Sequence, residues 1–291
     1  MNRSLRPAVA TTVVLLIGAS GCGDDDGGTA GSSDVAGGHI DGTAKKGRLT
    51  ARPGARRPDA QKPGLQELKL ETGEQALLRV PAGYSPTRPV SLVVMLHGAG
   101  SDARGGLAPL RELADEAGVM VLAPKSRGRT WDVILGDFGP DVAALNALLE
   151  HVFERFAIDP SRIGLGGFSD GASYALSLGL TNGDLFTHLI AFSPGFMVPG
   201  DLSGRPRIYV SHGVGDQVLP IETCSRRIVP ELRRGGYGVE YKEFEGGHTV
   251  PGPVARAALS WLEGEAGDAS GPELTTAPRA RQEGRGRARR R

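Results

Sequence analysis

Apolar residues occur between about residues 64 and 266 in two alternating patterns, short continuous runs and longer stretches with helical spacing. A continuous apolar run bounded by turn residues is typical of a strand that is buried on both faces of a parallel sheet. The runs predict strands at Pro89–His97, Val119–Pro124, Ile163–Phe168, Leu189–Phe192, Ile208–Val210 and Val239–Phe244. Two further segments, Leu65–Leu70 and Gln75–Val80, are predicted to form an antiparallel hairpin at the edge of the sheet.

Helical spacing is clearest over 141–156, where apolar residues recur at intervals of three and four and Pro160 prevents continuation. Further helices are predicted over 105–117, 170–180, 222–235 and 252–263. Strands that alternate with helices form βαβ units. The pattern therefore predicts an α/β domain at 64–266, with a mostly parallel central sheet and helices on both faces.

The first 21 residues have the pattern of an export signal. Arg3 and Arg6 precede the ten-residue apolar stretch Ala8–Ile17, and small residues then lead to Cys22. A cysteine at this point resembles the bacterial lipobox, in which the cysteine is lipidated, although Ala19 stands where that motif usually has leucine. The resemblance implies a cell-envelope lipoprotein held to the membrane by its lipid anchor. The alternative is an ordinary secretory signal and a secreted or periplasmic protein.

The segments on either side of the predicted domain have compositions that disfavour a packed core. Residues 22–63 contain no aromatic residue and are rich in Gly, Asp, Ser and Ala, so a disordered linker is expected there. The tail 267–291 ends with seven arginines in thirteen residues. Such a tail is either solvated or in contact with anionic lipid headgroups.

Overall charge and cysteine content exclude several classes of protein. The formal net charge is only +1, which argues against a domain that binds nucleic acid specifically. No apolar run reaches the length of about 18 residues that a membrane-spanning helix needs. Two cysteines exclude a disulfide-stapled scaffold and a Cys-rich zinc site, and Cys224 is expected to be a buried thiol.

A candidate nucleophile lies in Gly167-Phe168-Ser169-Asp170-Gly171, which matches the pattern Gly-x-Ser-x-Gly. A predicted strand precedes the motif and a predicted helix follows it, the context in which the serine hydroxyl of a nucleophile elbow is exposed. The alternative interpretation is a glycine-rich turn without chemistry.

A serine nucleophile needs a base, and the base needs a third group to orient it. Among the histidines after Ser169, His248 follows the last predicted strand, whereas His188 and His212 fit less well and are expected to be structural. Asp216 follows the strand that ends at Val210 and is the candidate acid, with Glu222 as the runner-up. Both predicted partners lie at carboxyl ends of strands, where active sites of open α/β sheets form.

Backbone N–H groups are the expected oxyanion donors. One is assigned to Asp170, directly after the nucleophile, and the other to Ala99, with Gly98 as the alternative. His97 is expected to brace this loop. Trp131 follows the strand that ends near Pro124 and is expected either to line the substrate pocket or simply to pack.

These pieces occur in a fixed order: His97-Gly98-Ala99-Gly100, the Ser169 motif, the Asp216 loop and His248. Over residues 75–264 the set resembles the phospholipase/carboxylesterase branch of the α/β-hydrolase superfamily. The resemblance implies an α/β-hydrolase fold and hydrolysis of carboxylic esters or thioesters through an acyl-enzyme. Asp170 stands where this branch often has glutamine, which affects the expected substrate preference rather than the backbone donor.

The reaction implied by the resemblance requires no metal or cofactor, and the histidines show no H-x-x-x-H spacing. No insertion between 181 and 205 is long enough for a large lid, so an open site is expected. Two other functions remain as alternatives, a serine peptidase on the same fold and a binding module of hydrolase fold without catalysis.

Overall fold

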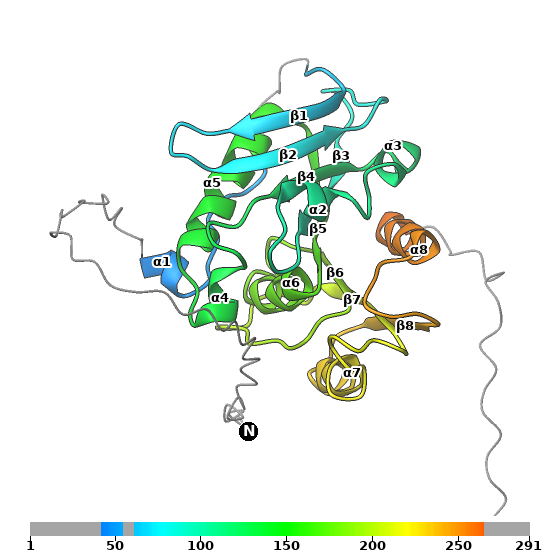
Figure 1. Ribbon diagram of the computed structural model, residues 1–291. Helices are drawn as coiled ribbons and strands as arrows, with labels where there is room; N and C mark the ends of the chain where they lie inside the picture. Colours follow the sequence, from blue (N-terminus) through cyan, green and yellow to red (C-terminus); the bar gives the residue numbers. More distant parts are fainter. Residues whose placement is uncertain (1–41, 55–60, 265–291) are drawn as a thin grey trace, which may run out of the picture. The chain divides into compact units, whose positions relative to one another are not determined.

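Eight strands form one sheet in the computed structural model, which describes residues 42–54 and 61–264 (Figure 1). The strand order is β1-β2-β4-β3-β5-β6-β7-β8. The hairpin β1–β2 and the pair β2–β4 are antiparallel and every other pair is parallel. The strands are β1 Gly64–Lys69, β2 Gln75–Val80, β3 Val90–Leu96, β4 Met120–Pro124, β5 Ile158–Phe168, β6 His188–Phe192, β7 Arg207–Gly213 and β8 Val239–Phe244. The predicted edge hairpin and mostly parallel sheet are confirmed.

Helices cover both faces of the sheet, as the sequence predicted. One face packs against α1, α4, α5, α6 and α7, and the other against α2, α3 and α8. The helices are α1 Gly42–Lys45, α2 Ala103–Leu107, α3 Leu113–Ala117, α4 Asp132–Leu135, α5 Pro140–Arg155, α6 Asp170–Thr181, α7 Ser225–Arg234 and α8 Gly252–Glu263. This architecture is that of an α/β-hydrolase fold.

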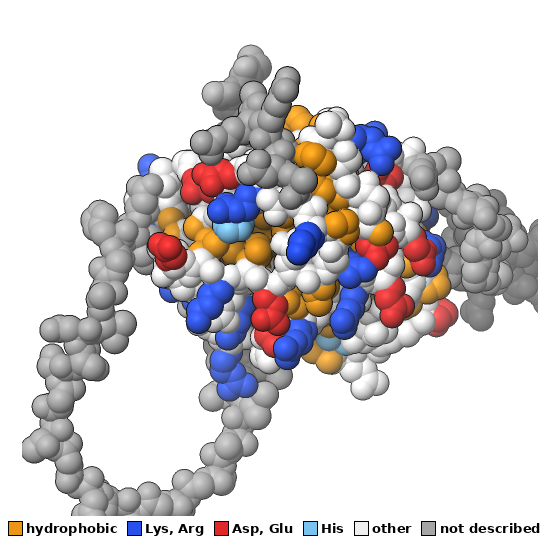
Figure 2. Space-filling view, turned by 90° about the horizontal axis from the view of Figure 1, so that it is seen from above, with side chains coloured by type: hydrophobic (Ala, Val, Ile, Leu, Met, Phe, Trp, Pro, Cys, Tyr) orange, Lys and Arg blue, Asp and Glu red, His pale blue; other side chains and the backbone are white. Residues whose placement is uncertain are grey.

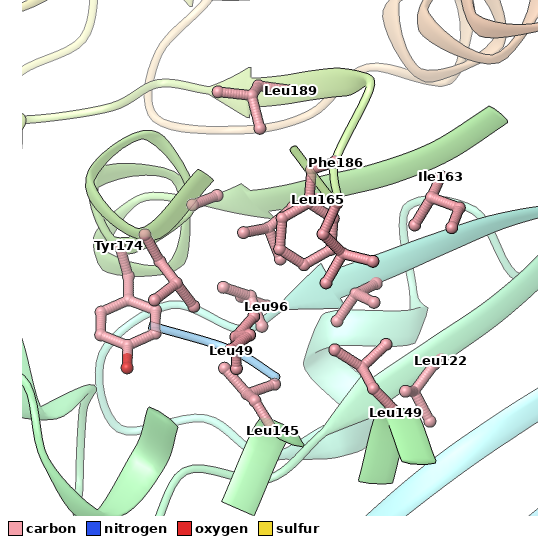
Figure 3. Close-up of a cluster of buried hydrophobic side chains, with 14 of the residues drawn as sticks. Leu49, Leu96, Leu122, Leu145, Leu149, Ile163, Leu165, Tyr174, Phe186 and Leu189 are labelled. Atoms are coloured by element: carbon pink, nitrogen blue, oxygen red, sulfur yellow. The ribbon is translucent and has the colours of Figure 1, made fainter. Parts of the chain in front are cut away.

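The central strand β3 explains why the apolar runs lack alternation. Leu92, Val94 and Leu96 enter the core on one face, and Val93 and Met95 enter the core on the other. Because successive side chains of a strand point to opposite faces, a strand covered by helices on both sides must be apolar at every position. Figure 3 shows the core on the α5 and α6 side, where Leu96 lies among side chains of helices and neighbouring strands.

The helix predicted over 105–117 is two short helices, α2 and α3. Pro109 follows the end of α2 and has no backbone N–H with which to continue the helical hydrogen bonds. Asp102 caps the start of α2 by accepting from the N–H groups of Arg104 and Gly105, and Gly118 ends α3 in the left-handed conformation. The single turn α4 was not predicted, because four residues are too few to establish a helical period.

Residues 42–54 form an N-terminal strap that packs on the domain, so the prediction of a linker over 22–63 is wrong for this segment. Leu49 and Ala51 are buried in the core. Figure 3 shows Leu49 near Leu145 of α5. Asn182, at the end of α6, accepts from the Leu49 N–H at 2.8 Å and donates to the Gly47 carbonyl at 2.6 Å. Composition misses the strap because three apolar side chains, Ala44 with Leu49 and Ala51, and a few satisfied backbone groups suffice to hold it.

Two arginines fasten the strap from outside. Arg48 and Arg52 both pair with Asp184, which lies just after α6. Burial raises the pKa of Asp184, but hydrogen bonds from Arg48, Ser203 and Arg52 outweigh this effect and lower the pKa to about 2. The carboxylate is therefore ionised over a wide pH range, and the strap depends on its charge.

The predicted signal 1–21, Cys22 and the arginine-rich tail lie outside the described residues. Over 42–54 and 61–264, no helix has the length and apolar character needed to cross a bilayer. On the face seen in Figure 2, basic and acidic side chains are intermixed with apolar ones.

Candidate active site

Ser169 stands on a strained turn between β5 and α6. Its backbone has φ 57° and ψ −122°, a conformation that costs free energy for a residue with a side chain. A Cβ at Gly167 would overlap the backbone of Gly171, and a Cβ at Gly171 would overlap the carbonyl of Leu96. The two flanking glycines are therefore required by close backbone approach, and together they form the elbow that exposes the Ser169 hydroxyl.

The structure brings Ser169, His248 and Asp216 into one hydrogen-bonded chain. His248 Nε2 lies 2.9 Å from Ser169 Oγ, and His248 Nδ1 lies 2.6 Å from Asp216 Oδ2. With Nδ1–H donating to the carboxylate, Nε2 is free to accept the serine proton. The ring of Phe168 packs against the imidazole at 4.6 Å between centroids. The geometry is that of a serine, its base and an orienting acid.

Asp216 is buried, and several donors surround its carboxylate. Oδ1 accepts from the N–H groups of Val218 at 2.9 Å and Leu219 at 2.8 Å. Burial raises the pKa of Asp216, but the hydrogen bonds from Leu219, His248 and Val218 and the charge of His248 outweigh it and lower the pKa. Asp216 is therefore held as an anion, the form that can stabilise an imidazolium.

The loops after β7 and β8 hold the acid and the histidine together. The Val214 N–H donates to the Phe244 carbonyl and the Gly215 N–H donates to the Gly246 carbonyl, both at 2.9 Å. Gly213 approaches the backbone of Gly246 and Gly247 too closely to admit a Cβ. The glycine-rich sequences around both residues are thus explained by the contact between the two loops.

The predicted oxyanion loop lies beside the nucleophile. A Cβ at Gly98 would be 3.3 Å from the Cβ of Ser169. Within the described part of the chain, the N–H groups of Gly98, Ala99 and Asp170 make no hydrogen bond to a protein acceptor, which leaves them available to a ligand. The Asp170 carboxylate accepts from Thr130 Oγ1 at 2.6 Å, so its side chain is engaged by the loop after β4.

Trp131 lies behind this loop, which corrects its assignment to the substrate pocket. The side chain is only 1% exposed, its Nε1–H donates to the His97 carbonyl at 2.9 Å, and its ring stacks on Tyr174. Because the indole is buried against His97 and Tyr174, it cannot line an open pocket. His97 accepts from the Ser126 N–H through Nε2, and it braces the loop as expected.

The remaining predicted residues lie away from Ser169. Glu222 is exposed and pairs with Arg226, so it does not contact His248. His188 begins β6 and packs against Trp261, and burial lowers the pKa of His188 to about 4. Cys224 is a buried free cysteine, and burial raises the pKa of its thiol. Over the described ranges, no three His, Cys, Asp or Glu side chains are grouped to hold a metal ion.

A row of buried hydroxyls on α6 was not predicted. Ser173, Ser177 and Thr181, here called the hydroxyl ladder, are spaced by four residues and are almost fully buried. Each donates to the carbonyl four residues earlier in the chain, and each accepts a backbone N–H from the loop after β6. The pairs are Gly195 with Ser173, Val198 with Ser177 and Gly200 with Thr181, each at 2.9 Å. The helix that carries Ser169 thereby positions this neighbouring loop.

A serine at the turn after β5, followed along the chain by an acid after β7 and a histidine after β8, is the arrangement of the α/β-hydrolases. The chain is a member of the α/β-hydrolase superfamily. The model of the phospholipase/carboxylesterase family matches residues 138–263, which include Ser169, Asp216 and His248.

Known proteins similar to this chain include several esterases. Feruloyl esterase C of Emericella nidulans is 27% identical over 158 residues, and a probable feruloyl esterase C of Aspergillus terreus is 28% identical over 158 residues. Each alignment covers 52% of this chain, and the chain spans 57% of the length of each relative.

Solved structures with the same fold include a thermostable esterase, at TM-score 0.56 and 25% identity over 69% of this chain and 62% of that chain. Esterase PE8 matches at TM-score 0.52 and 24% identity, over 71% of this chain and 100% of that chain.

Proposed function

We propose that the protein is a carboxylesterase-type serine hydrolase that cleaves carboxylic esters or thioesters through an acyl-enzyme. The observation that carries the proposal is the hydrogen-bonded chain Ser169–His248–Asp216, with the free N–H groups of Ala99 and Asp170 nearby. The esterases among the similar proteins support the same reaction class.

The reaction proceeds in two halves. His248 Nε2 takes the Ser169 proton as Oγ attacks the ester carbonyl, and Asp216 stabilises the imidazolium that forms. The N–H groups of Asp170 and of Ala99 or Gly98 stabilise the negative oxygen of the tetrahedral intermediate. The imidazolium then protonates the departing alcohol or thiol. A water molecule, activated by the same imidazole, attacks the acyl-enzyme, releases the acid and restores Ser169.

The substrate is proposed to carry an apolar group next to the ester. Ser169 lies at the carboxyl end of its strand, and exposed apolar side chains follow the carboxyl ends of three other strands. They are Leu135 after β4, Phe196 and Val198 after β6, and Val218 after β7. Their burial by a substrate would contribute to binding in proportion to the apolar area removed from water. Because two similar proteins are named feruloyl esterases, aromatic acyl esters belong in the first substrate panel.

The test compares hydrolysis of p-nitrophenyl esters of increasing chain length, methyl ferulate and a peptide anilide. Ser169→Ala is expected to reduce ester turnover by about 10⁴-fold or more. Ser161→Ala is the matched control, because this exposed serine lies near the opposite end of the same strand, β5. Ester turnover that survives Ser169→Ala would refute the nucleophile, and efficient anilide cleavage would favour a peptidase. A folded protein without turnover on any of these would favour a binding module.

We further propose export and anchoring of the chain to the cell envelope through a lipidated Cys22, with the arginine-rich tail near anionic lipid. The support is the signal-like sequence ahead of Cys22 and the composition of residues 22–41 and 267–291. Cys22→Ser is expected to move the protein from the membrane fraction to the soluble fraction after expression in a bacterial host. An unchanged membrane fraction would exclude the anchor.

A further inference from the structure

A second histidine lies against the acid of the site. His212, near the end of β7, has its Nε2 3.2 Å from Asp216 Oδ2, and both side chains are fully buried. The same carboxylate oxygen lies 2.6 Å from Nδ1 of His248. Two imidazoles therefore contact one oxygen of Asp216, while its other oxygen is occupied by the backbone N–H groups of Val218 and Leu219.

The surroundings of His212 fix where its proton lies. Nε2 also lies 2.8 Å from the carbonyl oxygen of Leu219, so this nitrogen faces two acceptors and must carry the hydrogen. Burial lowers the pKa of His212, which favours the neutral imidazole. Nδ1 is then an acceptor, and Ser225 Oγ, 2.6 Å away at the start of α7, must donate to it.

The result is a continuous row of polar contacts through the acid, Ser225–His212–Asp216–His248–Ser169. The Ser225–His212, Asp216–His248 and His248–Ser169 contacts are hydrogen bonds, and the His212–Asp216 contact is a close approach of 3.2 Å. Ser225 and His212 are completely buried, so water does not replace either donor. Asp216 thus has a serine–histidine pair on each side, His212 with Ser225 and His248 with Ser169. Of the two histidines, only His248 is partly exposed to solvent.

We propose that His212, backed by Ser225, is a positioning residue that sets the basicity of His248 through Asp216. This inference rests on the proposed esterase function. The Nε2–H of His212 donates to the Leu219 carbonyl, and its positive end also lies 3.2 Å from Asp216 Oδ2. There it stabilises the anion and weakens the hold of that anion on a protonated His248. His212 therefore keeps the imidazole of His248 available as a base at lower pH than Asp216 alone would allow.

Two other titratable groups, Glu243 and Cys224, lie near this row. Glu243 pairs with His212 in the register of β7 and β8, and its carboxylate is neutralised by Arg226 of α7. Cys224 precedes Ser225, and burial raises the pKa of its thiol. Neither group lies between His212 and His248 in this row of polar contacts.

The test measures the titration of His248 by NMR in the full chain, alongside the pH profile of kcat/KM on one p-nitrophenyl ester. His212→Phe removes the donor and is expected to raise the pKa of His248, and the acid limb of the profile, by about half a pH unit. His212→Gln can place an amide N–H near the position of Nε2 and is expected to restore most of the shift. Ser225→Ala is expected to give a smaller shift in the same direction.

His188→Gln is the matched control, because His188 is a buried histidine that packs on Trp261 rather than on Asp216. It is expected to leave the titration of His248 unchanged. A folded His212→Phe protein with the wild-type titration would overturn the proposal, as would an equal shift in the control. Should the Phe variant fail to fold, an unshifted titration in Ser225→Ala overturns it. The NMR titration needs no turnover, so a failure of the esterase proposal is recognised separately.

Discussion

At the residue scale, backbone contacts decide which side chains the site can contain. The left-handed conformation of Ser169 persists because Gly167 and Gly171 allow β5, α6 and the end of β3 to approach without side chains between them. A turn of this kind leaves a signature in the sequence, and the pattern Gly-x-Ser-x-Gly after an apolar run was sufficient to locate it.

The contrast with Trp131 shows what a sequence pattern omits. The position of Trp131 after a strand was visible, but its burial depends on packing with His97 and Tyr174, which are distant in sequence. The contacts of His212 were missed for the same reason. Asp216 and His248 were located because active-site residues follow the carboxyl ends of strands, and that edge is predictable from the order of the elements.

Trp131→Phe removes the indole N–H that the buried His97 carbonyl accepts. An unsatisfied buried carbonyl and the lost ring volume are expected to lower the free energy of unfolding by about 2 kcal/mol. Because His97 begins the loop of the candidate oxyanion donors, kcat is expected to fall more than KM changes. Urea denaturation measures the loss of stability, and steady-state kinetics measure kcat and KM. A variant that is less stable but keeps the wild-type kcat would show that Trp131 does not act on the loop.

At the element scale, α6 organises the site beyond the serine at its start. Its hydroxyl ladder holds the loop after β6, which carries the exposed Phe196 and Val198, and its last turn holds the N-terminal strap through Asn182. The serine and threonine spacing on α6 was visible in the sequence. Its partners were not, because the loop that donates to the hydroxyls has no hydrophobic period of its own.

Ser177→Ala leaves the Val198 N–H without its acceptor, at an expected cost of about 1–3 kcal/mol in unfolding free energy. With the loop less fixed, KM for an ester with a long or aromatic acyl group is expected to rise several-fold, while kcat on an acetate ester is retained. Thr181→Ser keeps a hydroxyl at the ladder and serves as the control. An equal change in KM for short and long esters would show that the hydroxyl ladder does not affect binding of the acyl group.

The strap is expected to lose part of its attachment in acid. The pKa of Asp184 is lowered to about 2 from its ordinary 3.8, so its contribution to stability is present above about pH 4 and is lost as the pH falls toward 2. Asp184→Asn is expected to cost about 1 kcal/mol near neutral pH, since the ion pairs are partly exposed. Denaturation at stepwise lower pH is expected to bring the wild type and the variant together, and a constant difference would contradict the assignment.

At the scale of the whole molecule, the sheet and its two helical layers followed from the sequence because buried parallel strands need apolar residues at every position. The beginning of the packed chain did not follow. A boundary at residue 64 matches the first strand, whereas Leu49 and Ala51 already lie in the core.

A chain that begins at residue 42 is therefore expected to be more stable than one that begins at residue 64. Removal of Leu49 and of the partners of the buried Asn182 is expected to cost about 3–5 kcal/mol. The midpoints of urea denaturation of the two truncated chains, with the same end at residue 264, measure the difference. Equal midpoints would show that the strap adds no stability.

The first and last helices of the described chain belong to opposite layers. α1 packs on the face that holds α5 and α6, and α8 packs on the other face (Figure 1). Any linker that joins residue 42 to residue 264, as in a cyclised or circularly permuted protein, must pass around an edge of the sheet. Peptides short enough to join adjacent ends are therefore too short for this domain. A circular permutation needs a longer linker that does not pass over the carboxyl ends of the strands, where Ser169 lies.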